Sequence, residues 1–277
     1  MKCYIEESII FNKGLLDNIC DAIYILTMEN SDRKNKYLDQ IHQFKLHKKI
    51  FIMKNKGYKN CTKKVCYKKK CEKIKDTSTD LINAYVSTFK HALQMNYQKI
   101  LILEDDFVCS PELKNKEHIN NIEIFTKKKN KSIFSFGVLP IITTYHSNFF
   151  RRSWISTGTH ATLFPSFFFK KIIDNEHNIC DIDVYLQLIS KRYIYYKPLI
   201  TQSFPLTDNF KTWGNSCIGK VGGIIFRFII SFLITIFELD KKEEPGTTRI
   251  YLVNKLLFDF IIPFLLLILF YIYYFRI

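Results

Sequence analysis

The most informative segment of this chain is Lys99-Ile-Leu-Ile-Leu-Glu-Asp-Asp-Phe107. Its apolar run, Ile100 to Leu103, is typical of a strand buried on both faces, as in the middle of a parallel sheet. Glu104, Asp105 and Asp106 follow directly, and an ionised carboxylate is costly away from water unless a cation neutralises it. Ligands of open α/β sheets bind beyond the carboxyl ends of strands. The segment therefore predicts a site for Mg²⁺ or Mn²⁺ and phosphate; the alternative is a solvated acidic turn.

Around this strand, strand-like and helix-like patterns alternate along the chain. We expect strands at residues 21–27, 50–53, 100–103, 133–137, 155–164 and 193–196, and helices at 34–44, 77–95, 112–128, 165–173 and 181–186. This alternation predicts an α/β architecture with a mostly parallel sheet flanked by helices. Thr77 or Ser78 is the expected N-cap of the second helix. The Lys-rich connection 54–76 is long enough to be mobile or functional.

At residue 219 the composition becomes strongly apolar. Val221 to Phe237 is interrupted only by Arg227, and Leu256 to Phe275 contains Asp259. The second run, extended back to Tyr251, provides the ~20 apolar residues that a bilayer crossing needs, whereas the first is at the short limit and can lie in the interface. Helices that are apolar all round favour membrane attachment over the alternative, two buried helices of a soluble protein.

These patterns divide the chain into an N-terminal extension (1–20), one α/β domain (21–218) and a membrane-associated region with one or two hydrophobic helices (219–277). The net charge of +15 favours anionic partners, although AT-rich codons produce the same Lys-rich composition. Since no helix-turn-helix, zinc-finger or RNA-binding aromatic motif is recognisable, we expect no nucleic-acid partner. The Lys run 63–75 is expected to be a solvated loop, which beside a bilayer would also attract anionic lipid.

The eight cysteines do not form a recognisable metal motif. Cys61, Cys66 and Cys71 lack the paired CxxC spacing of structural zinc sites. Residues 1–20 carry several charges and no continuous apolar core, unlike a signal peptide. The pattern therefore predicts free thiols in a reducing compartment, and the alternative is a disulfide within 61–71 if that loop is lumenal.

Several motifs occur in a fixed order along the chain. They are Ile23-Tyr-Ile-Leu26 followed by Asp32-Arg33, the helix Ala84-Tyr-Val-Ser-Thr-Phe-Lys-His-Ala-Leu93, the acidic cluster after Leu103, Thr157-Gly-Thr-His-Ala-Thr-Leu163, Asp181-Ile-Asp-Val-Tyr-Leu186 and Gln202-Ser-Phe-Pro205. From Asp21 to Asn209 the chain resembles glycosyltransferase family 25, which includes bacterial lipooligosaccharide and procollagen galactosyltransferases. It departs from that family where Ser87-Thr88 replaces the usual Ser-His, and in its C-terminal apolar segments.

The resemblance implies a GT-A fold, which is related to the Rossmann fold, a nucleotide-sugar donor and a divalent metal, Mn²⁺ or Mg²⁺. It implies that Asp106 and Glu104 contact the metal, with Asp105 as a catalytic residue of the same cluster. It also implies donor contacts by Arg33, together with Thr27 and Glu104. For Arg33 the alternative is a surface charge at the start of a helix.

Two further positions have competing interpretations. Asp183 is the best-placed acid outside the cluster for a general base, but an aspartate at a helix start is equally suited to N-capping. Asp181 can fill either role. His160 follows Gly158 in a segment expected to end near the sheet edge, where it is a contact for acceptor or metal, or a hydrogen-bonded structural histidine.

Together these features predict a membrane-anchored, metal-dependent glycosyltransferase that moves a hexose, galactose or glucose, from UDP-hexose to a glycan, lipid-linked or protein hydroxyl, with inversion. The rival functions are a metal-dependent nucleotidyl or phosphoryl transferase, and a degenerate transferase scaffold that acts as a basic membrane adaptor. A C-terminal anchor without an N-terminal signal predicts that the catalytic domain is cytosolic, with both termini there if both apolar runs cross.

Overall fold

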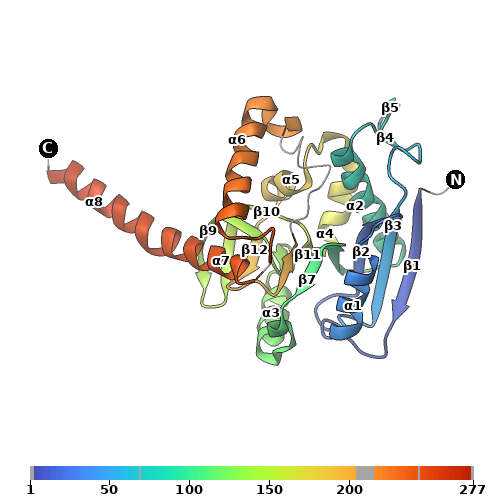
Figure 1. The fold of residues 1–277 in the computed structure, drawn as a ribbon, viewed down its shortest axis with the longest axis horizontal. Coiled ribbons are helices and arrows are strands. Elements are labelled where there is room, and N and C mark those ends of the chain that lie inside the picture. The colour runs from blue at the N-terminus through green and yellow to red at the C-terminus, as the bar shows by residue number, and fades with distance from the viewer. Residues whose placement is uncertain (1–2, 69, 204–214, 243, 276–277) are drawn as a thin grey trace.

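The computed structural model describes residues 3–68, 70–203, 215–242 and 244–275 of the 277-residue chain. Within them, nine strands form one sheet in the order β1-β3-β2-β6-β11-β8-β12-β10-β9 (Figure 1). These strands are β1 (Tyr4–Ile10), β2 (Ala22–Met28), β3 (Lys49–Asn55), β6 (Lys99–Glu104), β8 (Ile133–Ser135), β9 (Leu139–Ser147), β10 (Phe150–Thr157), β11 (Ala161–Pro165) and β12 (Arg192–Tyr195). Two small sheets pair β7 (Phe107–Cys109) with β13 (Ile200–Gln202), and β4 (Lys64–Tyr67) with β5 (Lys70–Lys73).

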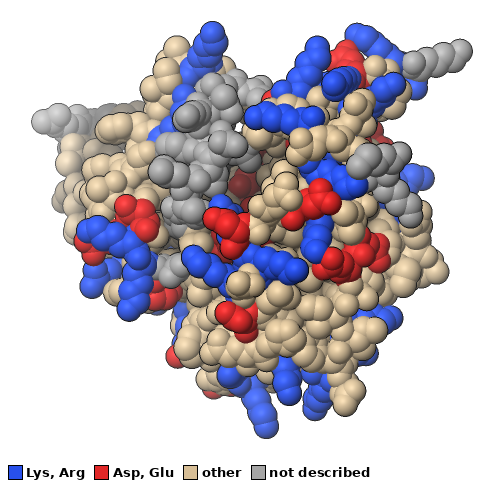
Figure 2. All heavy atoms as spheres, turned by 45° about the vertical axis from the view of Figure 1, so that its right-hand side comes forward, with Lys and Arg blue, Asp and Glu red and all other residues tan. Residues whose placement is uncertain are grey.

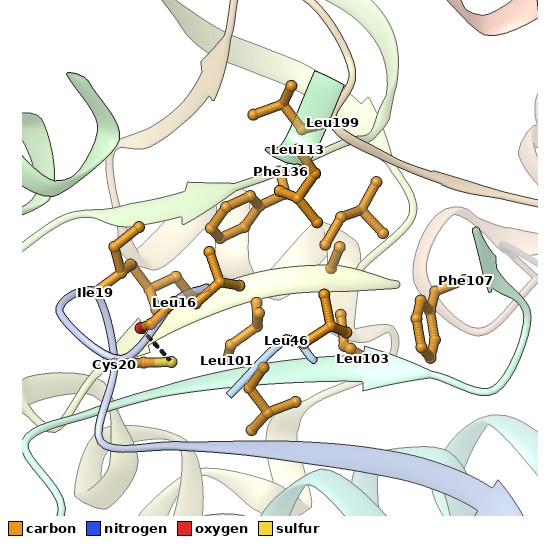
Figure 3. Packing of buried hydrophobic residues seen from close by; sticks show 14 of the residues in the cluster. Leu16, Ile19, Cys20, Leu46, Leu101, Leu103, Phe107, Leu113, Phe136 and Leu199 are labelled. Atoms are coloured by element: carbon orange, nitrogen blue, oxygen red, sulfur yellow. Dashed lines mark hydrogen bonds between the residues drawn. The ribbon is translucent and has the colours of Figure 1, made fainter. Parts of the chain in front are cut away.

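Helices cover both faces of the large sheet. They are α1 (Lys34–Phe44), α2 (Thr77–Gln94), η1 (Pro111–Lys114), α3 (Lys116–Lys128), α4 (Phe167–Asp174), η2 (Glu176–Asn178) and α5 (Ile182–Ile189). Successive side chains of a strand point to opposite faces, so Leu101 and Leu103 of β6 pack in the cluster that includes α1 and α3 (Figure 3). Ile100 and Ile102 pack on the other face, in the cluster that includes α2, α4 and α5. The expectation that this strand is buried on both faces is confirmed.

The sheet is mixed rather than mostly parallel. β2 runs parallel to both β3 and β6, and β12 runs parallel to β8. The remaining pairs in the sheet are antiparallel, including β11 with β6 and β1 with β3. The N-terminal stretch contributes the edge strand β1, and Leu16 and Ile19 are buried in the core. The α/β class is confirmed, and the parallel pairing is concentrated around β2.

Two local predictions differ from the structure. The N-cap of α2 is Asp76 rather than Thr77 or Ser78, because an Asp76 carboxylate oxygen accepts a hydrogen bond from the backbone N–H of Thr79 at 2.8 Å. The single strand expected at 155–164 is two strands, β10 and β11. Gly158 has φ +91° between them, a left-handed backbone conformation that ends the first strand.

Six cysteines form disulfides, so the prediction of free thiols is wrong for them. The bonds join Cys3 to Cys61, Cys66 to Cys71 and Cys180 to Cys217. The alternative disulfide within 61–71 is confirmed by the second of these bonds. The first and third join segments that are far apart in sequence, which no spacing rule reveals. The two remaining cysteines, Cys20 and Cys109, are buried thiols.

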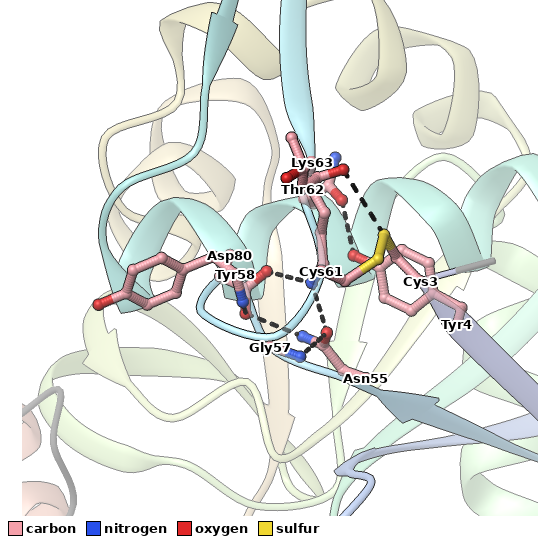
Figure 4. Close-up of a disulfide and its surroundings, with 10 residues drawn as sticks. Cys3, Tyr4, Asn55, Gly57, Tyr58, Cys61, Thr62, Lys63 and Asp80 are labelled. Carbon is pink, nitrogen blue, oxygen red and sulfur yellow. Dashed lines mark hydrogen bonds and ion pairs between the residues drawn. A yellow bond between two sulfur atoms is a disulfide. The ribbon is translucent and has the colours of Figure 1, made fainter. Parts of the chain in front are cut away.

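The Lys-rich connection 54–76 is anchored at its base rather than fully solvated. Beside the Cys3–Cys61 bond, the ammonium group of Lys63 is buried and pairs with Asp80 and Asn55 (Figure 4). Burial lowers the pKa of Lys63. The backbone N–H of Tyr58 also donates to Asp80, at 3.1 Å. This network fixes the connection to α2, and the short β4–β5 hairpin extends beyond it.

The C-terminal region contains two helices that are long and apolar enough to cross a membrane, Gly219–Ile236 and Gly246–Tyr274. The first lies within α6 (Asn215–Ile236), which is kinked at Gly219, where the composition changes. The second joins α7 (Gly246–Leu256), the π-helical turn η3 (Leu257–Ile261) and α8 (Ile262–Phe275). These apolar helices suggest membrane association. α8 projects away from the domain (Figure 1).

The charged side chains on one face are mixed in sign. Figure 2 shows Lys and Arg side chains interspersed with Asp and Glu across this face, which includes the side of the N-terminal strands. The large positive net charge is therefore not gathered here into one uniform basic surface.

Candidate functional site

The acidic cluster lies at the carboxyl end of β6, beside the carboxyl end of the parallel strand β2. Asp105 accepts three hydrogen bonds: from the Thr27 hydroxyl at 2.7 Å, the Ser31 hydroxyl at 2.7 Å and the Arg33 guanidinium at 2.9 Å. Parallel neighbours end at the same edge of a sheet, which explains why the residues after β2 meet those after β6. The structure thus brings Thr27 and Arg33 together with the acids, as expected for one site.

Asp106 is the acid with unused hydrogen-bonding capacity. One carboxylate oxygen, Oδ2, accepts from Gln202 Nε2 at 2.9 Å and lies 3.7 Å from Arg33 Nη1. The other, Oδ1, is buried and has no hydrogen-bond partner among the described residues. Burial raises the pKa of Asp106 to about 6, against the opposing effects of Gln202 and Arg33. A buried carboxylate with an open oxygen is suited to a cation.

Glu104 is held differently. One of its carboxylate oxygens accepts from the Tyr85 hydroxyl and the Thr159 hydroxyl, each at 2.9 Å. Burial raises the pKa of Glu104 to about 7, and the nearby Asp106 adds to the shift. These two hydroxyls fix the Glu104 carboxylate toward α2 and the turn before β11.

The donor set fits a cation that takes most of its ligands from elsewhere. No group of three or more His, Cys, Asp or Glu side chains arranged to hold a metal occurs among the described residues. Mg²⁺ is commonly bound by one or two carboxylates, with water and substrate phosphates completing its shell. Asp106 would hold such an ion through Oδ1, while Asp105 is engaged by three donors. Direct contact by Glu104 stays a prediction.

Asp183 lies on the other side of Glu104, at the start of α5, and does not cap that helix. The N-cap is Asp181, whose carboxylate accepts from the Val184 backbone N–H at 3.1 Å. Asp183 is buried and accepts from the Gly158 backbone N–H at 2.9 Å. Burial raises the pKa of Asp183 to about 7, although the Arg192 guanidinium opposes the shift. The capping interpretation of Asp183 is therefore wrong. Its contacts with Gly158 and Arg192 agree with another structural role, and its role as a base stays a prediction.

Arg192, the first residue of β12, is fully buried and holds this part of the site. Its guanidinium donates to the Gly158 carbonyl at 2.7 Å, to the Ser135 hydroxyl at 3.0 Å and to Asp183 at 3.4 Å. A buried charge needs several such partners to offset its lost hydration. Arg192 thereby fixes both Asp183 and the Gly158 turn.

His160 is buried, and its backbone carbonyl accepts from the Glu104 backbone N–H at 3.1 Å. Its Nε2 lies 3.3 Å from the Ile200 carbonyl oxygen, and its Nδ1 has no hydrogen-bond partner among the described residues. Burial lowers the pKa of His160 to about 4, so the ring is neutral near pH 7. A Cβ at Gly158 would lie 2.8 Å from Nδ1, so the glycine allows the turn to pass close to the ring. The Ile200 contact agrees with the structural interpretation, and a role toward acceptor or metal stays a prediction.

The sequence interpretation missed Tyr85, Arg192 and the hydrogen bond of Gln202. Tyr85 lies among the apolar residues of α2, where its spacing indicates only a core position, and Arg192 precedes a short apolar strand. Gln202 lies inside the quoted Gln202–Pro205 motif without an assigned role; its last two residues lie outside the described part of the chain. For Arg192 and Gln202, the sequence offered one signal, which is a single polar residue at the edge of an apolar run.

Comparisons with known proteins add no family to this picture. No family model matches the sequence, and no curated protein is significantly similar to it.

Proposed function

We propose that this chain is a membrane-anchored glycosyltransferase that moves a hexose from a nucleotide-sugar to a hydroxyl acceptor. The observation that carries the proposal is the open, buried Oδ1 of Asp106, a carboxylate whose other oxygen lies 3.7 Å from Arg33 Nη1 at the carboxyl edge of the sheet. Carboxylate and guanidinium side by side suit a diphosphate with its cation. The class of metal is Mg²⁺ or Mn²⁺, and the GT-A identity is part of the proposal.

In this mechanism the chain positions the donor and the acceptor. When bound, the cation stabilises the negative charge that develops on the diphosphate leaving group. Arg33, held by Asp105, supplies a fixed positive charge nearby at no cost of reorganisation. Glu104 stays between Tyr85 and Thr159 and supports the metal-binding segment. Asp183 accepts the proton of the acceptor hydroxyl as its oxygen bonds to the anomeric carbon and the bond from that carbon to the nucleoside diphosphate breaks. Attack opposite the leaving group in this single displacement gives inversion.

A donor-hydrolysis screen tests the function. Purified full-length protein in detergent is incubated with UDP-glucose, UDP-galactose and other nucleotide-sugars, with and without Mn²⁺, and released nucleotide is measured. We expect UDP release from one donor that depends on the metal. Mass spectrometry of the products identifies what is transferred: nucleotidyl or phosphoryl products would replace this proposal, and no turnover of any donor would favour the adaptor.

Asp183→Asn gives a separate prediction from the pH profile. Since the pKa of Asp183 is raised to about 7, the carboxylate is protonated below that pH, and the rate should fall about tenfold per pH unit on the acid side. Asp183→Asn should lower the rate by about 10²–10⁴-fold and move the acid limb down to about pH 6, the pKa of Asp106, because that carboxylate must still be ionised to hold the cation. The control is Asp181→Ala, which removes the α5 cap and costs about 1 kcal/mol of stability while an acid limb remains. An unchanged limb in Asp183→Asn would exclude it as the base.

The disulfides indicate on which side of the membrane the domain lies. Three disulfides in one domain are characteristic of proteins matured in an oxidising compartment and are rare in the cytosol. The proposal therefore places the domain on the lumenal or extracytoplasmic side of the membrane, in place of the cytosolic side that free thiols would have indicated.

A further inference from the structure

The two apolar C-terminal helices are attached to the domain in different ways. At its start, α6 is tied to the domain through the disulfide between Cys217 and Cys180, which lies just before α5. At its end, Leu239 is buried against the domain in a cluster with Leu139 of β9. Both ends of α6 are thus fixed to the same body.

The middle of α6 also packs on the domain. Ile230 is fully buried, in a cluster with Leu139, Leu239 and Ile250 of α7. Phe226, Leu233 and Ile234, which lie on the same side of the helix, pack against that cluster. The turn after α6 is tight, because a Cβ on Gly246 would lie 2.2 Å from the Phe237 carbonyl oxygen.

The opposite side of α6 is exposed and apolar. Val221 is 73% exposed, Phe228 70%, Phe232 54% and Ile236 55%, and their spacing places them on one helix face. A face of this kind is unfavourable in water and marks a surface for an apolar partner.

The α7–α8 helix begins on the domain and then leaves it. Asn254 of α7 donates to the Ile141 carbonyl oxygen of β9 at 2.9 Å, and Asp259 accepts a hydrogen bond from Arg151 Nη2 of β10 at 2.8 Å. From residue 260 to 274 the helix carries no charged residue, and most of its large apolar side chains are exposed. Figure 1 shows α8 projecting away while α6 runs along the domain.

We propose that only the second apolar helix crosses the bilayer, through its exposed segment from residue 260 onward, and that α6 lies in the membrane interface with its exposed apolar face against the lipid. A crossing helix has its ends on opposite sides of a hydrocarbon core about 30 Å thick, whereas both ends of α6 are attached to the domain. The partner is a bilayer because α6 packs through Ile230 on Ile250 of α7 and so lies beside the helix that leaves the domain (Figure 1). Interfacial helices bury one apolar face at the headgroup boundary in this way. The inference rests on the membrane attachment in the proposed function, not on the chemistry.

The surface beside this region has the composition of a membrane boundary. Tyr145 of β9 and Trp154 of β10 are exposed, at 62% and 48%. Tyr145 and Lys255 line a hollow next to Asp259 at the base of α8. Exposed Tyr, Trp and Lys are enriched at the headgroup level of membrane proteins, so this hollow marks the depth at which the domain meets the bilayer.

Spin labels on the full-length chain in lipid vesicles test the inference. Single cysteines replace Val221, Phe228, Phe232 and Ile236 in turn, and accessibility to lipid-soluble oxygen and to a water-soluble nickel complex gives their depth. An interfacial helix gives one shallow depth at all four positions. A crossing helix gives a depth that passes through the bilayer centre between the first and last position, and that result would overturn the inference.

Sidedness is measured separately in sealed vesicles with a membrane-impermeant thiol reagent. Lys241→Cys in the turn after α6 should be labelled on the same side as Lys73→Cys on the β4–β5 hairpin, and a C-terminal tag should be on the opposite side. Labelling of the two cysteines on opposite sides would mean that α6 crosses. Since buried Cys20 and Cys109 give little background, the parent chain is the control. Neither measurement uses catalysis. A failed donor assay therefore does not contradict the membrane arrangement, and a crossing α6 does not contradict the proposed activity.

Discussion

Asp106→Asn is expected to abolish metal-dependent donor hydrolysis and, at the same time, to stabilise the metal-free protein. Asp106 is the one carboxylate among the described residues with an open buried oxygen, and its loss would remove the proposed contact to the cation, so the rate should fall by at least about 10²–10³-fold. The measurement is UDP release from the active donor at saturating Mn²⁺.

The gain in stability follows from the sign of the pKa shift. The pKa of Asp106 is raised from 3.8 to about 6, so the folded state disfavours the charged form that dominates at pH 7.5. Such a group favours folding at low pH, and this contribution is lost as the pH rises through the folded pKa. Asparagine removes the buried charge but also its attraction to Arg33, so we expect a net gain of about 1–2 kcal/mol and a Tm higher by about 2–6 °C.

The matched control is Asp32→Asn, which changes an exposed aspartate beside Arg33. It should leave both the rate and the Tm unchanged. Mn²⁺ should raise the Tm of the parent protein and of the control, but not that of Asp106→Asn. If Asp106→Asn keeps its hydrolytic rate, or if Mn²⁺ stabilises it as it does the parent, Asp106 does not bind the cation.

Arg192→Met is expected to be the most destabilising single change in the site. It leaves Asp183 buried without its cationic partner and removes the donors to the Gly158 carbonyl and the Ser135 hydroxyl. Breaking a buried ion pair from one side costs about 3–5 kcal/mol, which lowers the Tm by about 10 °C for a domain of this size. Thermal unfolding at pH 7.5 measures the loss.

Two variants make this prediction specific. Lys191→Met changes the exposed neighbour of Arg192 and should leave the Tm unchanged. Arg192→Met combined with Asp183→Asn should be less destabilised than the sum of the two single changes, because the unpaired charge is gone. Additive losses would mean that Arg192 stabilises the fold through Gly158, Ser135 and packing, not through the charge of Asp183.

The part of the fold predicted from sequence is the part set by short-range patterns. The buried strand before Glu104 has a continuous apolar run, and α1 has its apolar residues at helical spacing, so both occur where expected. The division between β10 and β11 was missed because Thr157 to Leu163 suits one strand in composition. Only the left-handed φ of Gly158 reveals the break, and a glycine inside a strand pattern does not require it.

Site residues that lie at the carboxyl ends of neighbouring parallel strands could be predicted from the sequence. Contacts between segments that are distant in the sequence could not. Thr27 and Arg33 meet Asp105 because parallel neighbours end at one edge. The contact of Arg192 with Asp183 requires β12 to pass beside the Gly158 turn, which no local pattern encodes. The Cys3–Cys61 bond likewise spans 58 residues and depends on the pairing of β1 with β3.

The pairing of Asp259 with Arg151 fixes the direction of the second apolar helix relative to the domain. Since α7 and α8 are continuous and docked on β9 and β10 rather than joined through a linker, the domain cannot swing freely above the lipid. The acidic edge of the sheet is then held at a constant height over the headgroups. For the proposed transferase, we therefore expect selection of acceptors by the distance of their hydroxyl from the membrane surface.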